Sequence, residues 1–128
     1  PYMDGGLADS IPIEYALEKG NDKIVVVLTR NPGYRKKRAL KATEQLYKRA
    51  YKKYPNLVRA IMTRNAVYNR QMKLIEKLEE EGKIFVIRPL IPTVSRMEKD
   101  YDKLQHFYMH GNRLMKKEYQ GLLEYLNE

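Results

Sequence analysis

The sequence predicts an α/β fold, in which helices alternate with short buried strands. Two apolar runs, KIVVVLTR at residues 23–30 and KIFVIRP at residues 83–89, have the composition of strands buried on both faces of a parallel sheet. The segments between and after these runs repeat apolar residues at helical spacing. With 128 residues, the chain has the length of about one domain.

A short helix is predicted before the first strand. Asp9 or Ser10 is expected to be its N-cap, Pro12 lies in its first turn, and Gly20 is the expected stop. Its apolar positions are Ile13, Ala16 and Leu17. A helix at this place would lead directly into the first strand.

Helical spacing continues after the loop NPGYRKKR at residues 31–38. The first stretch ends at Pro55, which is expected to end or interrupt its helix. A short helical turn is then predicted at 57–63, followed by a separate helix marked by residues 67–78 and stopped at Gly82. The positions that mark the first of these helices are Leu40, Leu46, Tyr47, Ala50, Tyr51 and Tyr54.

A long helix is predicted at the C-terminal end, after the second strand and the loop LIPTVS. Ser95 and Glu98 have the spacing of a capping box at its start. Apolar residues then recur in steps of three, four and seven. They are Tyr101, Leu104, Tyr108, Met115, Tyr119, Leu122 and Leu126.

The net charge of +9 is concentrated in one segment. Residues 30–77 contain fifteen Lys or Arg but only Glu44 and Glu76 as acids. Such a segment is a solvated face, a nucleic-acid footprint or a patch that meets anionic lipid. Basic residues alternate with Tyr47, Tyr51 and Tyr54, which either stack on bases or pack half-buried at helical spacing.

Several chemistries are disfavoured by composition. The chain has no cysteine, which excludes disulfides, thiolate zinc sites and a cysteine nucleophile. His106 and His110 have a spacing that can bind a metal, but the acidic residue of the metalloprotease motif is missing between them, so no metal and no cofactor is expected. No apolar run reaches the length of a membrane span and no signal peptide is evident, which favours a cytoplasmic protein that is at most peripheral to a membrane.

The motif Asp4-Gly5-Gly6 stands apart from these elements. Asp-Gly is a common turn signal, and by itself the tripeptide favours a tight turn in which Gly5 or Gly6 takes a positive φ. A carboxylate followed by two glycines can also belong to a catalytic loop. The flanking residues decide between these two interpretations.

The predicted sheet is incomplete. A strand such as IVVVL needs neighbours on its edges and helices on its faces, yet only two strong strands are present. A strand carrying YMDGG at its C-terminal end would be cut off at Pro1, a residue that cannot be the encoded start of translation. We therefore expect this chain to be the C-terminal piece of a larger α/β domain.

The run DGGLADSIPIEYALEKG, followed by DKIVVVLTRNPGYRKK and later by YNRQ at 68–71 and IFVIRP at 84–89, resembles the C-terminal half of bacterial patatin-like phospholipases. This resemblance implies that residues 1–128 are the C-terminal fragment of a single three-layer α/β/α domain. Residues 1–38 would supply the DGG loop, the short helix and a buried strand. Residues 39–128 would supply a helical region with one further strand.

The resemblance implies a Ser-Asp dyad in which Asp4 accepts the proton of the serine, with Gly5 and Gly6 as supporting residues of the motif. A serine hydroxyl needs such a base to attack an acyl carbonyl at neutral pH. Ser10 and Ser95 have no glycine two residues before or after them, so neither lies in a G-x-S-x-G elbow. We expect the elbow and the oxyanion loop upstream, and this fragment alone to be inactive.

Two functions follow from the sequence. The first is a lipid acyl hydrolase, a phospholipase or esterase, that acts on phospholipid or other lipid esters, with its basic segment against an anionic membrane and with possible self-association of the fragment. The second is a non-catalytic basic module that binds nucleic acid or an anionic surface. Nucleic acid is not the favoured partner. Glu79, Glu80 and Glu81 are expected to be a solvated helix end, not a metal site.

Overall fold

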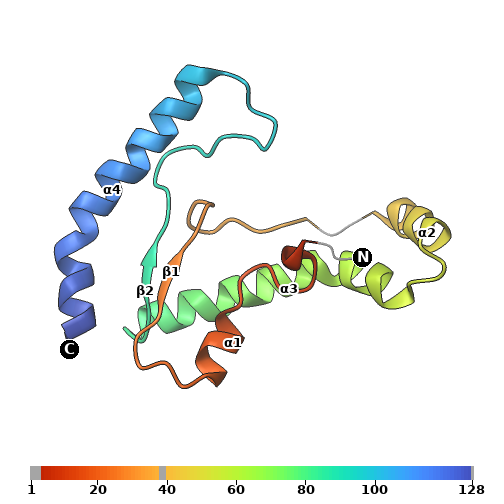
Figure 1. Ribbon diagram of the computed structural model, residues 1–128, viewed down its shortest axis with the longest axis horizontal. Coiled ribbons are helices and arrows are strands. Elements are labelled where there is room, and N and C mark those ends of the chain that lie inside the picture. Colours follow the sequence, from red (N-terminus) through yellow and green to blue (C-terminus); the bar gives the residue numbers. More distant parts are fainter. Residues whose placement is uncertain (1–3, 38–39, 128) are drawn as a thin grey trace. The chain divides into compact units, whose positions relative to one another are not determined.

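A computed structural model of the chain describes residues 4–37 and 40–127, except for the side chain of Lys41. These residues form a mostly helical structure with a two-stranded parallel sheet and a long C-terminal helix (Figure 1). The elements are a 3-10 turn η1 (Gly5–Leu7), α1 (Ile13–Glu18), β1 (Val25–Val27), α2 (Lys41–Ala50), α3 (Pro55–Glu80), β2 (Phe85–Ile87) and α4 (Tyr101–Asn127). The predicted strand through Tyr2 and Met3, and the boundary predicted between 38 and 39, lie outside the described residues.

The chain divides into two compact units. Unit 1 comprises residues 1–21 and 35–77, and unit 2 comprises residues 22–34 and 78–128. Unit 1 contains η1, α1, α2 and most of α3. Unit 2 contains the sheet and α4.

The long helix α3 dominates unit 1. The prediction of a short turn at 57–63 and a separate later helix was wrong, because residues 55–80 form one continuous helix of 26 residues. The sequence from 56 to 81 contains neither proline nor glycine, so nothing breaks the helix. Pro55 takes the first helical position, where its missing N–H costs no hydrogen bond, and α2 has already ended at Ala50.

The predicted stop of α3 at Gly82 is confirmed. The amide of Gly82 donates to the carbonyl of Glu79 at 3.0 Å, and the amide of Lys83 donates to the carbonyl of Leu78 at 2.9 Å. These two bonds form a Schellman motif, which requires a residue with positive φ. Gly82 has a φ of +68°, a conformation in which a Cβ would be strained.

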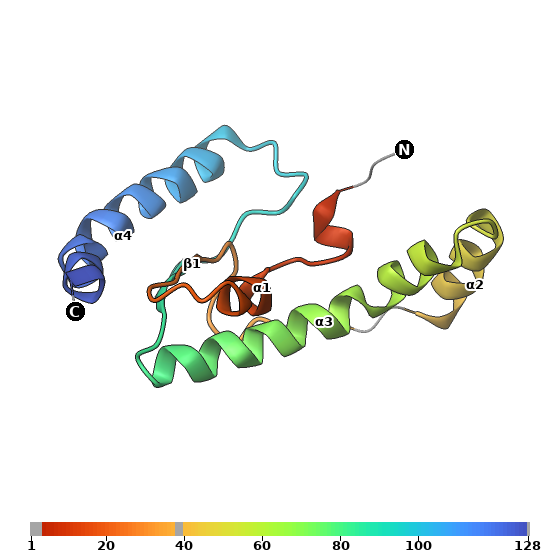
Figure 2. The same ribbon diagram turned by 60° about the horizontal axis from the view of Figure 1, so that its bottom comes forward.

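Helix α1 lies beside α3 in both views of the ribbon (Figures 1 and 2). Ile13 of α1 is 3% exposed, and Glu14 pairs with Arg70 of α3 at 3.2 Å. The buried side chains of unit 1 are Ile13, Val58, Tyr68, Gln71, Met72 and Ile75. Five of these six belong to α3, so the core of unit 1 follows one face of that helix.

The predicted N-cap of α1 was wrong. The cap position is occupied by Pro12, which has no side chain that can accept a hydrogen bond. Asp9 and Ser10 instead bond to groups outside α1, as described for the candidate site below. The predicted stop is confirmed, because α1 ends at Glu18 and Gly20 has a φ of +70°.

The sheet of unit 2 is parallel, as predicted, and β1 and β2 lie side by side (Figure 1). Their register pairs Val25 with Phe85 and Val27 with Ile87. Burial on both faces of the first strand is wrong for the described residues, because burial alternates along it. Ile24, Val26 and Leu28 are buried, whereas Val25 is 39% and Val27 is 70% exposed. Such alternation belongs to a strand covered on one face.

Tyr125 connects α4 to the start of both strands. Its hydroxyl oxygen accepts from the amide of Ile24 at 2.9 Å, and the hydroxyl lies 3.0 Å from the carbonyl of Lys83. Its ring contacts Phe85, with 5.8 Å between the ring centroids. Tyr125 is only 8% exposed, so these bonds supply partners for a hydroxyl that is buried against the sheet.

Two details of α4 differ from prediction. Asp100, not Ser95, caps the helix, because its carboxylate accepts from the amides of Asp102 and Lys103. The hydrogen bond from the backbone of Lys103 lowers the pKa of the Asp100 carboxyl, so the stabilisation by this cap is lost as pH falls through that lowered value. The apolar stripe predicted along α4 is largely exposed, whereas Leu114 and Tyr125 are buried.

We predict opposite effects for the same substitution at two glycines. Gly82→Ala should lower the free energy of unfolding by about 1–2 kcal/mol, because alanine is strained at positive φ. Gly111→Ala should raise it by about 0.5–1 kcal/mol, because Gly111 lies inside α4 and an added Cβ meets no atom within 4 Å. Urea unfolding of both variants tests this, and equal signs would contradict the assigned stop of α3.

The exposed edge of β1 should promote self-association, because unpaired strands template pairing with another chain. Val27→Lys places a charge at a residue that is 70% exposed and should shift the chain toward monomer in sedimentation velocity runs over a range of concentrations. Tyr101→Lys, at a residue of α4 that is 72% exposed, is the matched control and should leave association unchanged. A wild-type chain that remains monomeric at every concentration would contradict the prediction.

Candidate functional site

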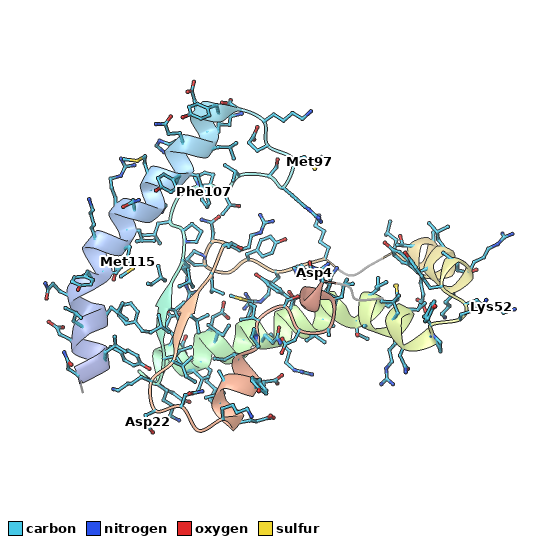
Figure 3. The ribbon with its side chains drawn as sticks, viewed as in Figure 1. Asp4, Asp22, Lys52, Met97, Phe107 and Met115 are labelled. Carbon is cyan, nitrogen blue, oxygen red and sulfur yellow. The ribbon has the colours of Figure 1, made fainter. Side chains whose placement is uncertain are left out.

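Asp4 lies at the start of η1 and is exposed (Figure 3). Its Oδ1 accepts a hydrogen bond from the amide of Gly6 at 2.8 Å, and its carbonyl accepts from the amide of Leu7 at 3.0 Å. Within the described residues, Oδ2 accepts no hydrogen bond. One oxygen of the carboxylate thus orients the group, and the other is left without a hydrogen bond from the described residues.

The backbone conformation of the two glycines differs from the one expected for the turn. Neither Gly5 nor Gly6 has a positive φ, so that part of the expectation was wrong. A 3-10 turn uses right-handed backbone conformations, which do not need glycine. The space at Gly6 is what matters, because a Cβ there would lie 3.3 Å from Oδ1 of Asp4. Glycine at this position lets the carboxylate fold back over the turn.

The turn is closed by Ser10 and anchored by Asp9. The Ser10 hydroxyl donates to the carbonyl of Gly6 at 2.9 Å, so this serine is bonded within the turn and not to the carboxylate of Asp4. The side-chain amide of Gln71 on α3 donates to the carboxylate of Asp9. Gln71 is 1% exposed, so this bond ties the turn to the buried face of α3.

Gln71 was not predicted to have any role. Its Oε1 is buried and has no hydrogen-bond partner in the part of the chain that the structure describes. Buried polar groups normally find partners, and a glutamine in the core therefore marks a position where bonding matters more than packing. In the sequence, Gln71 stands next to Met72 and one helical turn from Tyr68 and Ile75. All three of these residues are buried, so this spacing is the signal that places Gln71 on the buried face of the helix.

The loop after Tyr34 is fixed on α3 by amide side chains. The amide of Lys36 donates to Asn69 at 2.8 Å, and Asn69 donates back to the carbonyl of Lys36 at 2.9 Å. Asn65, one turn earlier, donates to the carbonyl of Lys37 at 2.7 Å. Arg35 forms an ion pair with Glu76. Loop and helix thus form one continuous surface in unit 1.

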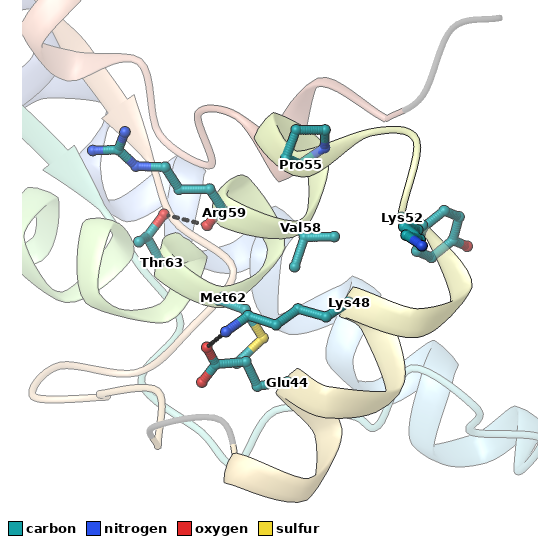
Figure 4. Close-up of a pocket in the computed structure, with 9 residues that line it drawn as sticks. Glu44, Lys48, Lys52, Pro55, Val58, Arg59, Met62 and Thr63 are labelled. Carbon is teal, nitrogen blue, oxygen red and sulfur yellow. Dashed lines mark hydrogen bonds and ion pairs between the residues drawn. The ribbon is translucent and has the colours of Figure 1, made fainter.

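A groove of about 410 Å³ separates α2 from the start of α3 (Figure 4). Val58 and Met62 point into it from α3, and Lys48 pairs with Glu44 across one turn of α2 at 2.8 Å (Figure 4). Its other lining residues are Tyr51, Lys52, Pro55, Arg59 and Thr63. Tyr47 and Tyr51 stack on each other with 6.1 Å between centroids and are half-buried, as predicted for packing tyrosines, whereas Tyr54 is 56% exposed.

The histidines and glutamates considered as metal ligands in the sequence are hydrogen-bonded, ion-paired or exposed. Nε2 of His110 accepts from the amide of Leu90 at 3.1 Å, and His106 is exposed. Glu79 pairs with Arg88, and Glu81 pairs with Lys83 at 2.7 Å at the end of α3. Among the described residues, no group of three or more His, Cys, Asp or Glu is placed to hold a metal ion.

Comparison with known proteins identifies a family model that matches part of the chain. A family model described as Domain of unknown function (DUF6363) matches residues 54–127, more than half of the chain. The matched region covers α3, β2 and α4 and does not include Asp4. No curated protein and no solved structure matches the chain. No helix within the described residues is both long and apolar enough to cross a membrane.

The hydrogen bond between Asp9 and Gln71 predicts a non-additive pair of substitutions. Asp9→Ala should lower the free energy of unfolding by about 1–3 kcal/mol, because it leaves the buried amide of Gln71 without a partner. In a Gln71→Leu background the same change should cost much less, because no buried donor remains. Urea unfolding of the four chains measures this coupling, and strictly additive effects would show that the bond does not anchor the turn.

Proposed function

The chain belongs to the DUF6363 family, whose function is unknown, and we propose that it is the C-terminal part of a patatin-like lipid acyl hydrolase. In this proposal the chain belongs to a three-layer α/β/α domain whose remaining parts lie upstream. The substrate is a phospholipid or another lipid ester. Asp4 is the base of a Ser-Asp dyad, and the serine lies upstream.

One observation carries the proposal, namely the state of the Asp4 carboxylate. It is exposed, it is oriented through Oδ1 by the amide of Gly6, and its Oδ2 accepts no hydrogen bond among the described residues. A general base needs an oriented oxygen within hydrogen-bond reach of the hydroxyl that it deprotonates. The anchored turn supports this role, because Ser10 and the bond from Gln71 to Asp9 hold the turn in place.

The reaction proceeds in two halves. The serine oxygen attacks the acyl carbonyl while its proton passes to Asp4, and the tetrahedral intermediate then releases the alcohol, which takes the proton back from Asp4. Water attacks the resulting acyl-serine and gives one proton to Asp4. Collapse of the second intermediate releases the fatty acid and returns that proton to the serine oxygen. Asp4 is therefore unchanged after each turnover.

The incomplete sheet is consistent with an upstream half. In the described residues the sheet consists of two strands only, and Val25 and Val27 are exposed. Strands of a parallel sheet normally have covered faces and paired edges. An upstream half would supply further strands, the nucleophile elbow and the oxyanion loop. The chain alone would then hydrolyse no ester, because it has the base without the nucleophile.

A non-catalytic basic module is the second candidate. The observation in its favour is that Asp4 caps its own turn, a role that needs no catalytic function. The two candidates differ in what precedes Pro1. A G-x-S-x-G elbow and a glycine-rich loop in the upstream coding sequence support the hydrolase, and their absence supports the basic module.

Asp4→Asn in the protein that includes the upstream half should lower esterase turnover by at least about 10²-fold to 10⁴-fold, because an amide cannot take the serine proton. The thermal midpoint should change little, because the oxygen of asparagine can still accept from the amide of Gly6. Asp22→Asn, at another exposed aspartate, is the matched control and should retain full turnover. Near-normal turnover of Asp4→Asn would make Asp4 a turn residue only.

A further inference from the structure

The outward face of α2 is apolar, although nothing in the described structure covers it. Ala42, Leu46 and Ala50 recur at every fourth residue and are exposed, with Leu46 65% exposed. Leu40, which caps the helix, is 73% exposed. The opposite face carries Glu44, Lys48 and Tyr51, which line the groove between α2 and α3. Two exposed leucines in such a short region need an explanation, because exposed apolar side chains gathered in one place often mark an interaction surface.

Basic residues lie on α2 and just after its C-terminal end. Arg49 lies on α2 beside Leu46, and Lys52 and Lys53 follow in the turn before α3. None of these three forms an ion pair within the described residues, and Lys52 also lines the groove between α2 and α3 (Figure 4). We call Leu40, Leu46, Arg49, Lys52, Lys53 and Tyr54 the α2 surface.

Acidic residues do not offset this charge. Residues 30–77 contain only two acids, and both are engaged in ion pairs. Glu44 pairs with Lys48 on the groove side, and Glu76 pairs with Arg35. Within residues 30–77, no acidic residue therefore offsets the charges of Arg49, Lys52 and Lys53 on the α2 surface. The combination of such charges with exposed leucines is typical of helices that lie in the interface of an anionic membrane.

A nucleic acid fits the same surface less well. The tyrosines that would stack on bases are Tyr47 and Tyr51, and these stack on each other and are half-buried. A phosphate backbone also gives no apolar partner to Leu40 or Leu46. An anionic bilayer provides both, because headgroups meet the cations and acyl chains receive the leucines and Tyr54.

We propose that the α2 surface docks this chain on the surface of anionic membranes, with Leu46 inserted below the headgroups. This inference extends the proposed lipid hydrolase. It rests on that proposed function only for the purpose of docking, which is to bring the catalytic site to its substrate. The binding itself depends only on residues of this chain. Membrane binding and hydrolysis can therefore succeed or fail separately.

Co-sedimentation of the chain with vesicles tests the docking. Vesicles of phosphatidylcholine with about 30 mol% phosphatidylglycerol should bind the chain at low salt. High salt should release the chain, because it shortens the Debye length and screens the attraction. Vesicles of phosphatidylcholine alone should bind much less. Equal binding to both compositions, or binding that salt does not weaken, would overturn the proposal.

Charge variants distinguish the α2 surface from the overall charge. Each basic residue near an anionic leaflet contributes about fivefold to binding, so Arg49→Gln with Lys52→Gln and Lys53→Gln should weaken it about 100-fold. Arg113→Gln with Lys116→Gln and Lys117→Gln removes three exposed charges from α4 and should have a much smaller effect. Equal losses in the two triple variants would overturn the assignment to α2.

Insertion can be measured directly, because the chain has no tryptophan. In Leu46→Trp the single tryptophan should shift its emission to the blue and be quenched by brominated lipid on binding. Tyr108→Trp, at an exposed residue of α4, should show neither change. A shift only at residue 108, or binding of single-stranded RNA without any binding to vesicles, would overturn the proposal. Loss of turnover in Asp4→Asn with vesicle binding intact leaves the docking in place.

Discussion

The uninterrupted helix α3 is the constraint on which unit 1 depends. Its residues 55–77 carry a buried apolar face together with amide side chains that bond to the peptide groups of neighbouring loops. Gln71 anchors the turn that contains Asp4, and Asn69 pairs with both backbone groups of Lys36. Because these contacts are made by one rigid helix, the turn and the loop are held in a fixed relation within this unit.

The same arrangement fixes the turn that orients the Asp4 carboxylate in the candidate site. A carboxylate on a flexible terminus would be a poor base, since its orientation would have to be fixed at each turnover. Here the amide of Gly6 orients Asp4, and Gly6 has no side chain to displace it. In the proposed activity, this chain therefore contributes one oriented group, the carboxylate of Asp4. The proposed docking surface on α2 is a separate property, because it binds the membrane and takes no part in the reaction.

Much of the fold could be predicted from local signals. The stops at Gly20 and Gly82 and the long C-terminal helix follow from short-range patterns, and the two apolar runs identify the strands that pair in parallel. Caps were harder, because Asp9 and Ser10 are good capping residues that instead bond to Gln71 and to the carbonyl of Gly6. Burial was harder still. Val27 and Leu46 are apolar residues of the kind found in cores, yet both are exposed. A sequence pattern shows which residues are apolar but does not show what covers them.

The most direct test of the central claim is covalent labelling of the longer protein with a fluorophosphonate probe, which reacts with activated serines, followed by mapping of the labelled peptide by mass spectrometry. We expect one labelled serine upstream of Pro1, within a G-x-S-x-G sequence, because a serine beside a base is the activated one. Absence of labelling, or labelling of Ser10 or Ser95, would contradict a dyad that includes Asp4.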